Sequence, residues 1–265
     1  MISRCVHGEE NKIISYIGSD YASCLYLYLD LKRYGIISNR IEVYLQYERE
    51  KITAVLLKYF SCLHIYSKEN AFNPEEMMAF FTSHKFSMLY CTARTAKRIL
   101  GIFPRSTAER LTVTNGWVAQ IKCVDKKAQG VAVLAEKSDF HQIVSMIYED
   151  EGIGRSYEIN DLAKQLEERN QEGYARNLVI KRGNMVIAHA CTNAEYEDIS
   201  VVAELLVRRE YRKKGYASEI WRDLCDRLLS EHKEVYSFYY SEESRMLHKR
   251  IGFFELCEWT KIVFS

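Results

Sequence analysis

Residues 211–218 read Tyr-Arg-Lys-Lys-Gly-Tyr-Ala-Ser, and the chain is organised around this stretch. An apolar, strand-like run at 201–207 precedes it, and a pattern typical of an amphipathic helix follows it. The stretch is therefore expected at a helix N-terminus, where unpaired backbone N–H groups and the helix dipole attract anions. Gly215 lets a ligand approach the backbone closely, and three neighbouring cations add positive charge. The sequence thus predicts a phosphate-binding turn here.

The stretch also carries a family resemblance. Arg212-x-x-Gly215-x-Ala217 resembles the Arg/Gln-x-x-Gly-x-Gly/Ala signature of the GNAT superfamily of acyl-CoA-dependent N-acetyltransferases. Segments 201–207 and 235–240 resemble the fourth and fifth strands of that family, and 244–253 resembles its last helix and the turn that follows. Four segments in the right order cover about half of the chain, its second half.

The predicted fold class is α/β (α+β), with a mixed, mostly antiparallel sheet flanked by helices. We expect two domains, an N-terminal α/β domain at 1–128 and a GNAT-like acetyltransferase domain at 129–265. In the first half, three strands, a helix, a strand and a helix follow the same order as in the second half. Two interpretations stay open, a degenerate copy of the GNAT fold or an unrelated α/β domain. The first half has no basic glycine turn at its strand-to-helix junction, Lys68–Asn73, and is therefore expected not to bind coenzyme A.

Composition narrows the class of protein. Of the 265 residues, 48% are hydrophobic and 28% charged, and a formal net charge of +1 gives no general attraction to nucleic acid or membranes. The eight cysteines are not spaced as metal ligands, so no metal is expected, and they are interpreted as reduced thiols. No secretory signal or membrane-spanning run is evident, which predicts a cytoplasmic protein without a membrane or nucleic-acid partner. The sequence leaves open whether the protein forms a homodimer.

The resemblance implies a set of cofactor contacts. In the family, the basic turn binds the pyrophosphate of coenzyme A, and a backbone N–H of the fourth strand polarises the thioester carbonyl. A bulge in that strand would free such a donor. Ser241 stands where many relatives have an asparagine that contacts the pantetheine arm. The expected cofactor-binding residues are Leu205, Leu206, Val207, Arg212, Lys213, Lys214, Gly215, Tyr216, Ala217, Ser218, Ser241 and Ser244.

Two residues are candidates for proton transfer. Glu204 lies between apolar neighbours in the predicted strand, and desolvation should raise its pKa toward the range of a general base. The alternative is a glutamate at a solvated edge or in a structural ion pair. His248 occupies the position where the family often has a tyrosine acting as general acid, and histidine can also donate a proton. The alternative is a packing residue.

These features predict an acyltransferase enzyme, an N-acetyltransferase that moves an acetyl group from acetyl-CoA to a primary amine of a small molecule or peptide by direct attack. A non-catalytic acyl-CoA-binding regulatory protein remains the alternative, and a longer acyl chain is a third interpretation. Two acidic clusters, Glu149–Glu151 and Glu195–Asp198, could attract the cationic amine. The helix after Gly215 is expected to leave Arg222, Asp223, Asp226 and Arg227 in solvent.

Overall fold

The computed structural model describes residues 2–150 and 159–264. By compactness the chain forms two units, residues 1–118 with 256–265 (unit 1) and residues 119–255 (unit 2). The predicted boundary at 128/129 therefore differs from the compact units in two places. Residues 119–128 lie in unit 2, and the last ten residues, 256–265, lie in unit 1.

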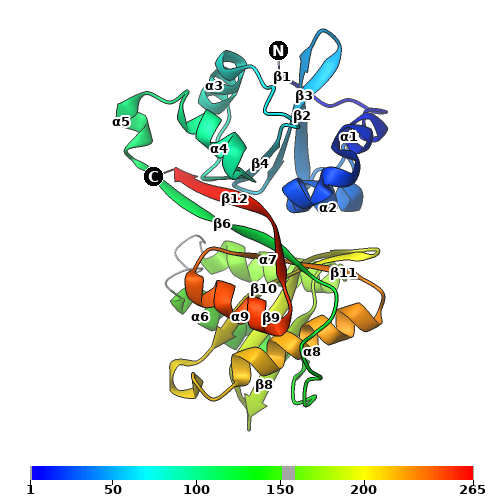
Figure 1. The fold of residues 1–265 in the computed structure, drawn as a ribbon, viewed down its shortest axis with the longest axis vertical. Helices are drawn as coiled ribbons and strands as arrows, with labels where there is room; N and C mark the ends of the chain where they lie inside the picture. The colour runs from blue at the N-terminus through cyan, green and yellow to red at the C-terminus, as the bar shows by residue number, and fades with distance from the viewer. Residues whose placement is uncertain (1, 151–158, 265) are drawn as a thin grey trace. The chain divides into compact units, whose positions relative to one another are not determined.

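Unit 1 combines helices with a mostly antiparallel sheet (Figure 1). Its elements are β1 (Ile2–Arg4), α1 (Glu10–Ile17), α2 (Leu25–Tyr34), β2 (Ile41–Glu48), β3 (Lys51–Tyr59), β4 (Cys62–Tyr66), α3 (Pro74–Ser83), β5 (Met88–Thr92), α4 (Ala93–Leu100), α5 (Arg105–Ala108) and β6 (Leu111–Ile121), whose last residues enter unit 2. The sheet order is β1-β2-β3-β4-β5-β12, where β12 (Phe254–Phe264) ends the chain. Only β4 and β5 pair in parallel within the register described for these strands.

Local sequence explains the start of α3. Pro74 occupies the first turn, and the Asn73 side chain accepts a hydrogen bond from the backbone N–H of Glu76 at 3.0 Å, as expected of an N-cap. Its buried residues Met77 and Phe80 join a core with β4, β5 and Ile262 of β12. A separate core of unit 1 joins α1 and α2 to β2 and β3.

Unit 2 repeats this order of elements. They are β7 (Val133–Leu134), α6 (Phe140–Glu149), α7 (Ile159–Gln171), β8 (Asn177–Arg182), β9 (Met185–Tyr196), β10 (Ile199–Val207), α8 (Tyr216–Ser230), β11 (Glu234–Tyr239) and α9 (Glu242–Ile251). The sheet order is β11-β10-β9-β8-β7, with β10 and β11 in parallel and the other described pairs antiparallel. In both units, three antiparallel strands lead through a helix into a strand parallel to the third. The order of elements therefore favours the repeat over an unrelated first domain.

Helices cover both faces of the unit 2 sheet (Figure 1). Residues of α6 and α7, among them Ile147 and Leu166, pack in one core cluster with Val179, Val186 and Leu206. On the other face, α8 contacts β8 to β11 through a stripe that includes Ile220, Trp221 and Leu224. No helix among the described residues is long and apolar enough to cross a bilayer.

One expectation about α8 is wrong. Arg222 and Asp223 are both buried, at 6% exposure each, rather than solvated. The Arg222 guanidinium makes a bidentate ion pair with Asp125 at 2.6 and 2.9 Å, and Asp223 pairs with Arg227. Helical periodicity could not predict this burial, because the segment after β6 that covers this side of α8 is remote in sequence.

Candidate active site

The basic turn forms the N-terminus of α8, as the sequence predicts. Gly215 is the N-cap, with φ of 88°, and Tyr216, Ala217 and Ser218 form the first turn of the helix. A Cβ built at Gly215 meets no atom within 4 Å, so the space in front of this backbone is open. The first N–H groups of a helix have no partner within it and point toward such a space. The geometry suits an anionic group such as a pyrophosphate.

Cations surround this turn. Nε of Arg212 donates to the carbonyl of Val207 at 3.0 Å, which fixes its side chain beside the end of β10. Nζ of Lys214 donates to the carbonyl of Glu210 at 3.0 Å and lies 5.2 Å from the Tyr211 ring centroid. Sequence reasoning missed Arg182, whose guanidinium donates to the hydroxyl of Tyr216 at 3.0 Å. Arg182 ends β8, and only the folded sheet brings it to the turn.

Strand β10 carries the irregularity that the predicted chemistry requires. In the β9–β10 ladder, Ala203 pairs with Cys191 and Leu206 with His189, so β10 has one extra residue between these pairs. Glu204 takes up the distortion with a left-handed backbone, φ 53°. On the other side, the described register with β11 ends at Val202 and Ser237. The backbone after Val202 thus leaves the parallel ladder, and a bulge at this place can present a free N–H.

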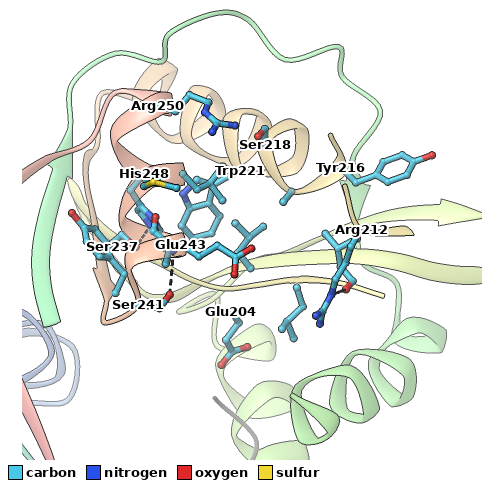
Figure 2. A pocket seen from close by; sticks show the side chains of 18 of the residues that line it. Glu204, Arg212, Tyr216, Ser218, Trp221, Ser237, Ser241, Glu243, His248 and Arg250 are labelled. Atoms are coloured by element: carbon cyan, nitrogen blue, oxygen red, sulfur yellow. Dashed lines mark hydrogen bonds between the residues drawn. The ribbon is translucent and has the colours of Figure 1, made fainter. Parts of the chain in front are cut away.

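These parts line one cavity of about 830 Å³ within unit 2 (Figure 2). In Figure 2, Arg212 and Tyr216 stand on one side of it, Ser241 and His248 on the other, and Glu204 between them. Of the predicted site residues, only Lys214 is not part of its lining. The structure also adds residues that the sequence did not indicate for the site, among them Trp221, Ser237, Tyr240, Glu243 and Arg250. They come from separate elements, and no local motif marks them.

Glu204 is a carboxylate in a poorly solvated place. Its Oε2 accepts a hydrogen bond from Sγ of Cys191 at 3.4 Å. Burial raises the pKa of Glu204, and the cysteine hydrogen bond and the positive charge of Arg169 lower it only in part. A raised pKa near the cavity wall is what a general base needs at neutral pH.

His248 is held as a neutral imidazole. Its Nδ1 lies 2.7 Å from the backbone carbonyl of Ser244, which can only accept, so Nδ1 carries the proton. Nε2 then accepts from the Ser237 hydroxyl at 2.9 Å. The side chain is 3% exposed, and burial lowers the pKa of His248 to about 4. At neutral pH its one ring proton is therefore already donated to a carbonyl, a geometry that favours a packing residue over the predicted acid.

Ser241 and part of one acidic cluster lie at the cavity, whereas other predicted residues do not. Ser241 is the N-cap of α9, and its Oγ accepts from the backbone N–H of Ser244 at 3.1 Å. Its hydroxyl proton can still be donated to a ligand in the cavity. Among the predicted acidic clusters, Asp150 lines the cavity, whereas Glu195 is in ion pairs with Arg176 and Lys233. Glu151 lies outside the described residues.

Comparison with known proteins identifies the second half. Residues 139–253, which contain the cavity lining, match the model of the acetyltransferase (GNAT) family. These residues form a GNAT acetyltransferase domain. Acyl transfer is the chemistry of this family, so the match at residues 139–253 supports an acyltransferase. No curated protein matches it in sequence.

Solved structures extend the fold likeness to the whole chain. A Drosophila protein is similar with a TM-score of 0.68 at 10% identity, over 100% of this chain and 98% of that one. A GCN5-related N-acetyltransferase from Sphaerobacter thermophilus gives 0.62 at 12% identity, over 99% and 94%. A GNAT-family acetyltransferase from Colwellia psychrerythraea gives 0.60 at 9% identity, over 100% of both chains. At these identities the likeness shows the fold, a mostly antiparallel sheet flanked by helices.

Proposed function

We propose that the GNAT domain transfers an acetyl group from acetyl-CoA to a primary amine of a small molecule or peptide. One observation carries the proposal. The anion-binding turn of α8, the bulged strand β10 and the partly desolvated Glu204 line a single cavity. An acyl donor held at its phosphates and an amine beside a carboxylate can meet there.

Each wall of the cavity has a role in this reaction. The turn at 212–218 binds the pyrophosphate through helix N–H groups and cations. A backbone N–H of the bulge at Leu205 or Leu206 polarises the thioester carbonyl as negative charge develops on its oxygen. Glu204 accepts the proton of the attacking amine, directly or through a water. The nitrogen attacks the carbonyl carbon, the C–S bond breaks, and the thiolate of coenzyme A leaves without an acyl-enzyme intermediate.

The acceptor is expected to be cationic before it reacts. Asp150 and Glu243 line the same cavity as Glu204 and add negative charge to it. An ammonium ion is attracted to such a surface and must lose a proton to become a nucleophile. The arrangement therefore favours amines over hydroxyl acceptors.

The test is acetyl transfer to a panel of primary amines, followed by mass spectrometry of the product and chromatography of free coenzyme A. General-base catalysis is typically worth about 10²–10⁴-fold, so Glu204→Gln should reduce kcat/KM by that factor. Glu167→Gln is the control, because Glu167 is an exposed carboxylate of α7 outside the cavity lining, and it should change kcat/KM by less than about tenfold. An equal loss in both variants would remove Glu204 from the role of base.

A non-catalytic acyl-CoA-binding protein is the second candidate, and the neutral state of His248 favours it, because no proton donor is then poised at the leaving group. Such a protein binds acetyl-CoA and produces no acetylated amine. Comparing acetyl-CoA with longer acyl-CoA thioesters in the same assay separates a third case, in which only a longer chain is transferred.

A further inference from the structure

Three side chains with metal-ligand chemistry meet at the bulge of β10. His189 and Cys191 are two residues apart on β9 and therefore share one face of the sheet. Glu204 reaches them from β10 through its left-handed backbone. The imidazole nitrogen, the thiol sulfur and a carboxylate oxygen all lie within 4.8 Å of one another. Such a set contains the ligand types that Zn²⁺ takes in proteins.

The protonation of His189 fits a metal ligand. Nε2 lies 2.9 Å from Oδ1 of Asn177, and an amide oxygen only accepts, so Nε2 carries the proton. In that tautomer the lone pair is on Nδ1, which is fully buried beside the backbone of Glu204. Metal-binding histidines show this pattern, in which the second nitrogen donates to an oxygen and fixes the ring.

Charge balance favours a divalent cation. Cys191 and Glu204 lie in contact, and two buried anionic groups side by side are costly without a cation between them. A bound divalent ion displaces the thiol proton to solvent, and two anionic ligands then neutralise its charge. The nearest cation, Arg169, is engaged through Nη1 with the backbone and side-chain oxygens of Asn193 at 2.6 and 3.0 Å.

We propose that His189, Cys191 and Glu204 form a zinc-type metal site that shares its carboxylate with the acyl-transfer cavity. Three protein ligands leave a fourth position for water or a substrate atom, as in open zinc sites. A second consequence rests on the proposed function. Metal bound to Glu204 removes the base, so zinc binding switches acyl transfer off, and chelation restores it.

Cobalt(II) is the probe for binding, because a Co²⁺–thiolate bond gives a near-ultraviolet charge-transfer band. Metal-free protein titrated with Co²⁺ should develop this band at one equivalent, and Zn²⁺ should abolish it. Cys191→Ser should lose the band. His189→Gln and Glu204→Gln should each weaken Co²⁺ binding by at least about tenfold, and Asn177→Ala by about 10–100-fold as the partner of His189.

Cys123→Ser is the control, because Cys123 is an exposed thiol that could bind cobalt adventitiously. This variant should keep the band and its affinity. Circular dichroism confirms that each variant is folded, and in a thermal scan Zn²⁺ should raise the melting temperature of the parent but not of Cys191→Ser. The site is overturned if the parent gives no band, or if Cys123→Ser loses it and Cys191→Ser keeps it.

An activity assay separates the metal site itself from its effect on acyl transfer. With an amine substrate in hand, Zn²⁺ should inhibit the parent reversibly, and Cys191→Ser should need at least about tenfold more Zn²⁺ for the same inhibition. Stoichiometric metal binding without inhibition would sustain the site and overturn its control of Glu204. If no amine is acetylated at all, the proposed function fails while the cobalt result stands by itself.

Discussion

At the scale of single residues, the site depends on one strained position. Glu204 holds a left-handed backbone, φ 53°, which costs on the order of 1–3 kcal/mol for a residue other than glycine. The surrounding ladder enforces it, because Ala203 and Leu206 are both paired with β9. The distortion places a carboxylate against Cys191 and on the cavity wall. A regular strand would supply neither contact.

His248 makes a residue-scale prediction about pH. Its pKa in the folded chain is about 4, below the ordinary value of 6.5. Between these values the unfolded chain binds more protons, so stability is constant above pH 6.5 and is lost as the pH falls toward 4. The loss attributable to His248 is about 3 kcal/mol. Urea unfolding of the parent and His248→Gln at pH 7.5, 6 and 5 should show the gap between them shrinking as pH falls.

The His248→Gln variant also tests whether His248 acts as the general acid. A positioned acid contributes about 10²–10⁴-fold, whereas a packing residue contributes to stability alone. We therefore expect the folded His248→Gln protein to keep kcat/KM within about tenfold of the parent at pH 7.5. A loss of several hundredfold with unchanged coenzyme A affinity would restore His248 as the acid.

At the scale of elements, the turn before α8 depends on glycine for two reasons. Gly215 has φ 88°, a conformation that other L-residues adopt only with strain, and its front side is open. The open side is where the helix N-terminus meets an anion. Gly215 is thus needed both for the backbone conformation of the turn and for the space that the ligand occupies.

Gly215→Glu should abolish coenzyme A binding, because the added carboxylate projects into the space for the pyrophosphate and repels it. Gly215→Ala is the matched control. It carries the same backbone strain, about 1–2 kcal/mol, without the charge. Calorimetry should show much weaker binding for the glutamate variant than for the alanine variant. Equal coenzyme A affinity in both folded variants would mean that phosphates bind elsewhere.

At the scale of the whole molecule, the chain contains the same order of elements twice, and the strand that follows each copy ends in the other unit. Strand β6 follows the first copy, and its residues 119–121 belong to unit 2. Strand β12 follows the second copy, and its residues from 256 onward belong to unit 1, where they pair with β5. The end of the chain therefore stabilises the unit that contains its beginning.

Ile262→Ala tests this assignment. Ile262 is fully buried, pairs with Leu89 and packs in a core of unit 1. The substitution should cost about 2–5 kcal/mol, as for other large-to-small changes in a core. In hydrogen exchange, β4 and β5 should lose protection while β10 and β11 keep theirs. The reverse pattern would place the last strand with unit 2.

Coenzyme A stoichiometry tests the difference between the copies. The junction at 68–73 in unit 1 has no basic glycine turn, and its residues Glu69 and Asn70 have positive φ without being glycine. Calorimetry on the full chain should give one site, and Gly215→Glu should leave none. A second site that survives in that variant would show that unit 1 also binds the cofactor.

The sequence by itself determined what is local. The glycine turn, the strand before it, the cap of α3 and the order of elements follow from backbone conformation and periodicity, which a few neighbouring residues fix. Tertiary structure decided what depends on pairing across the sheet. The bulge at Glu204, the burial of Arg222 and the meeting of His189 with Cys191 and Glu204 all require partners remote in sequence. Strand register and side-chain burial are properties of the assembled sheet, and no short stretch of chain encodes them.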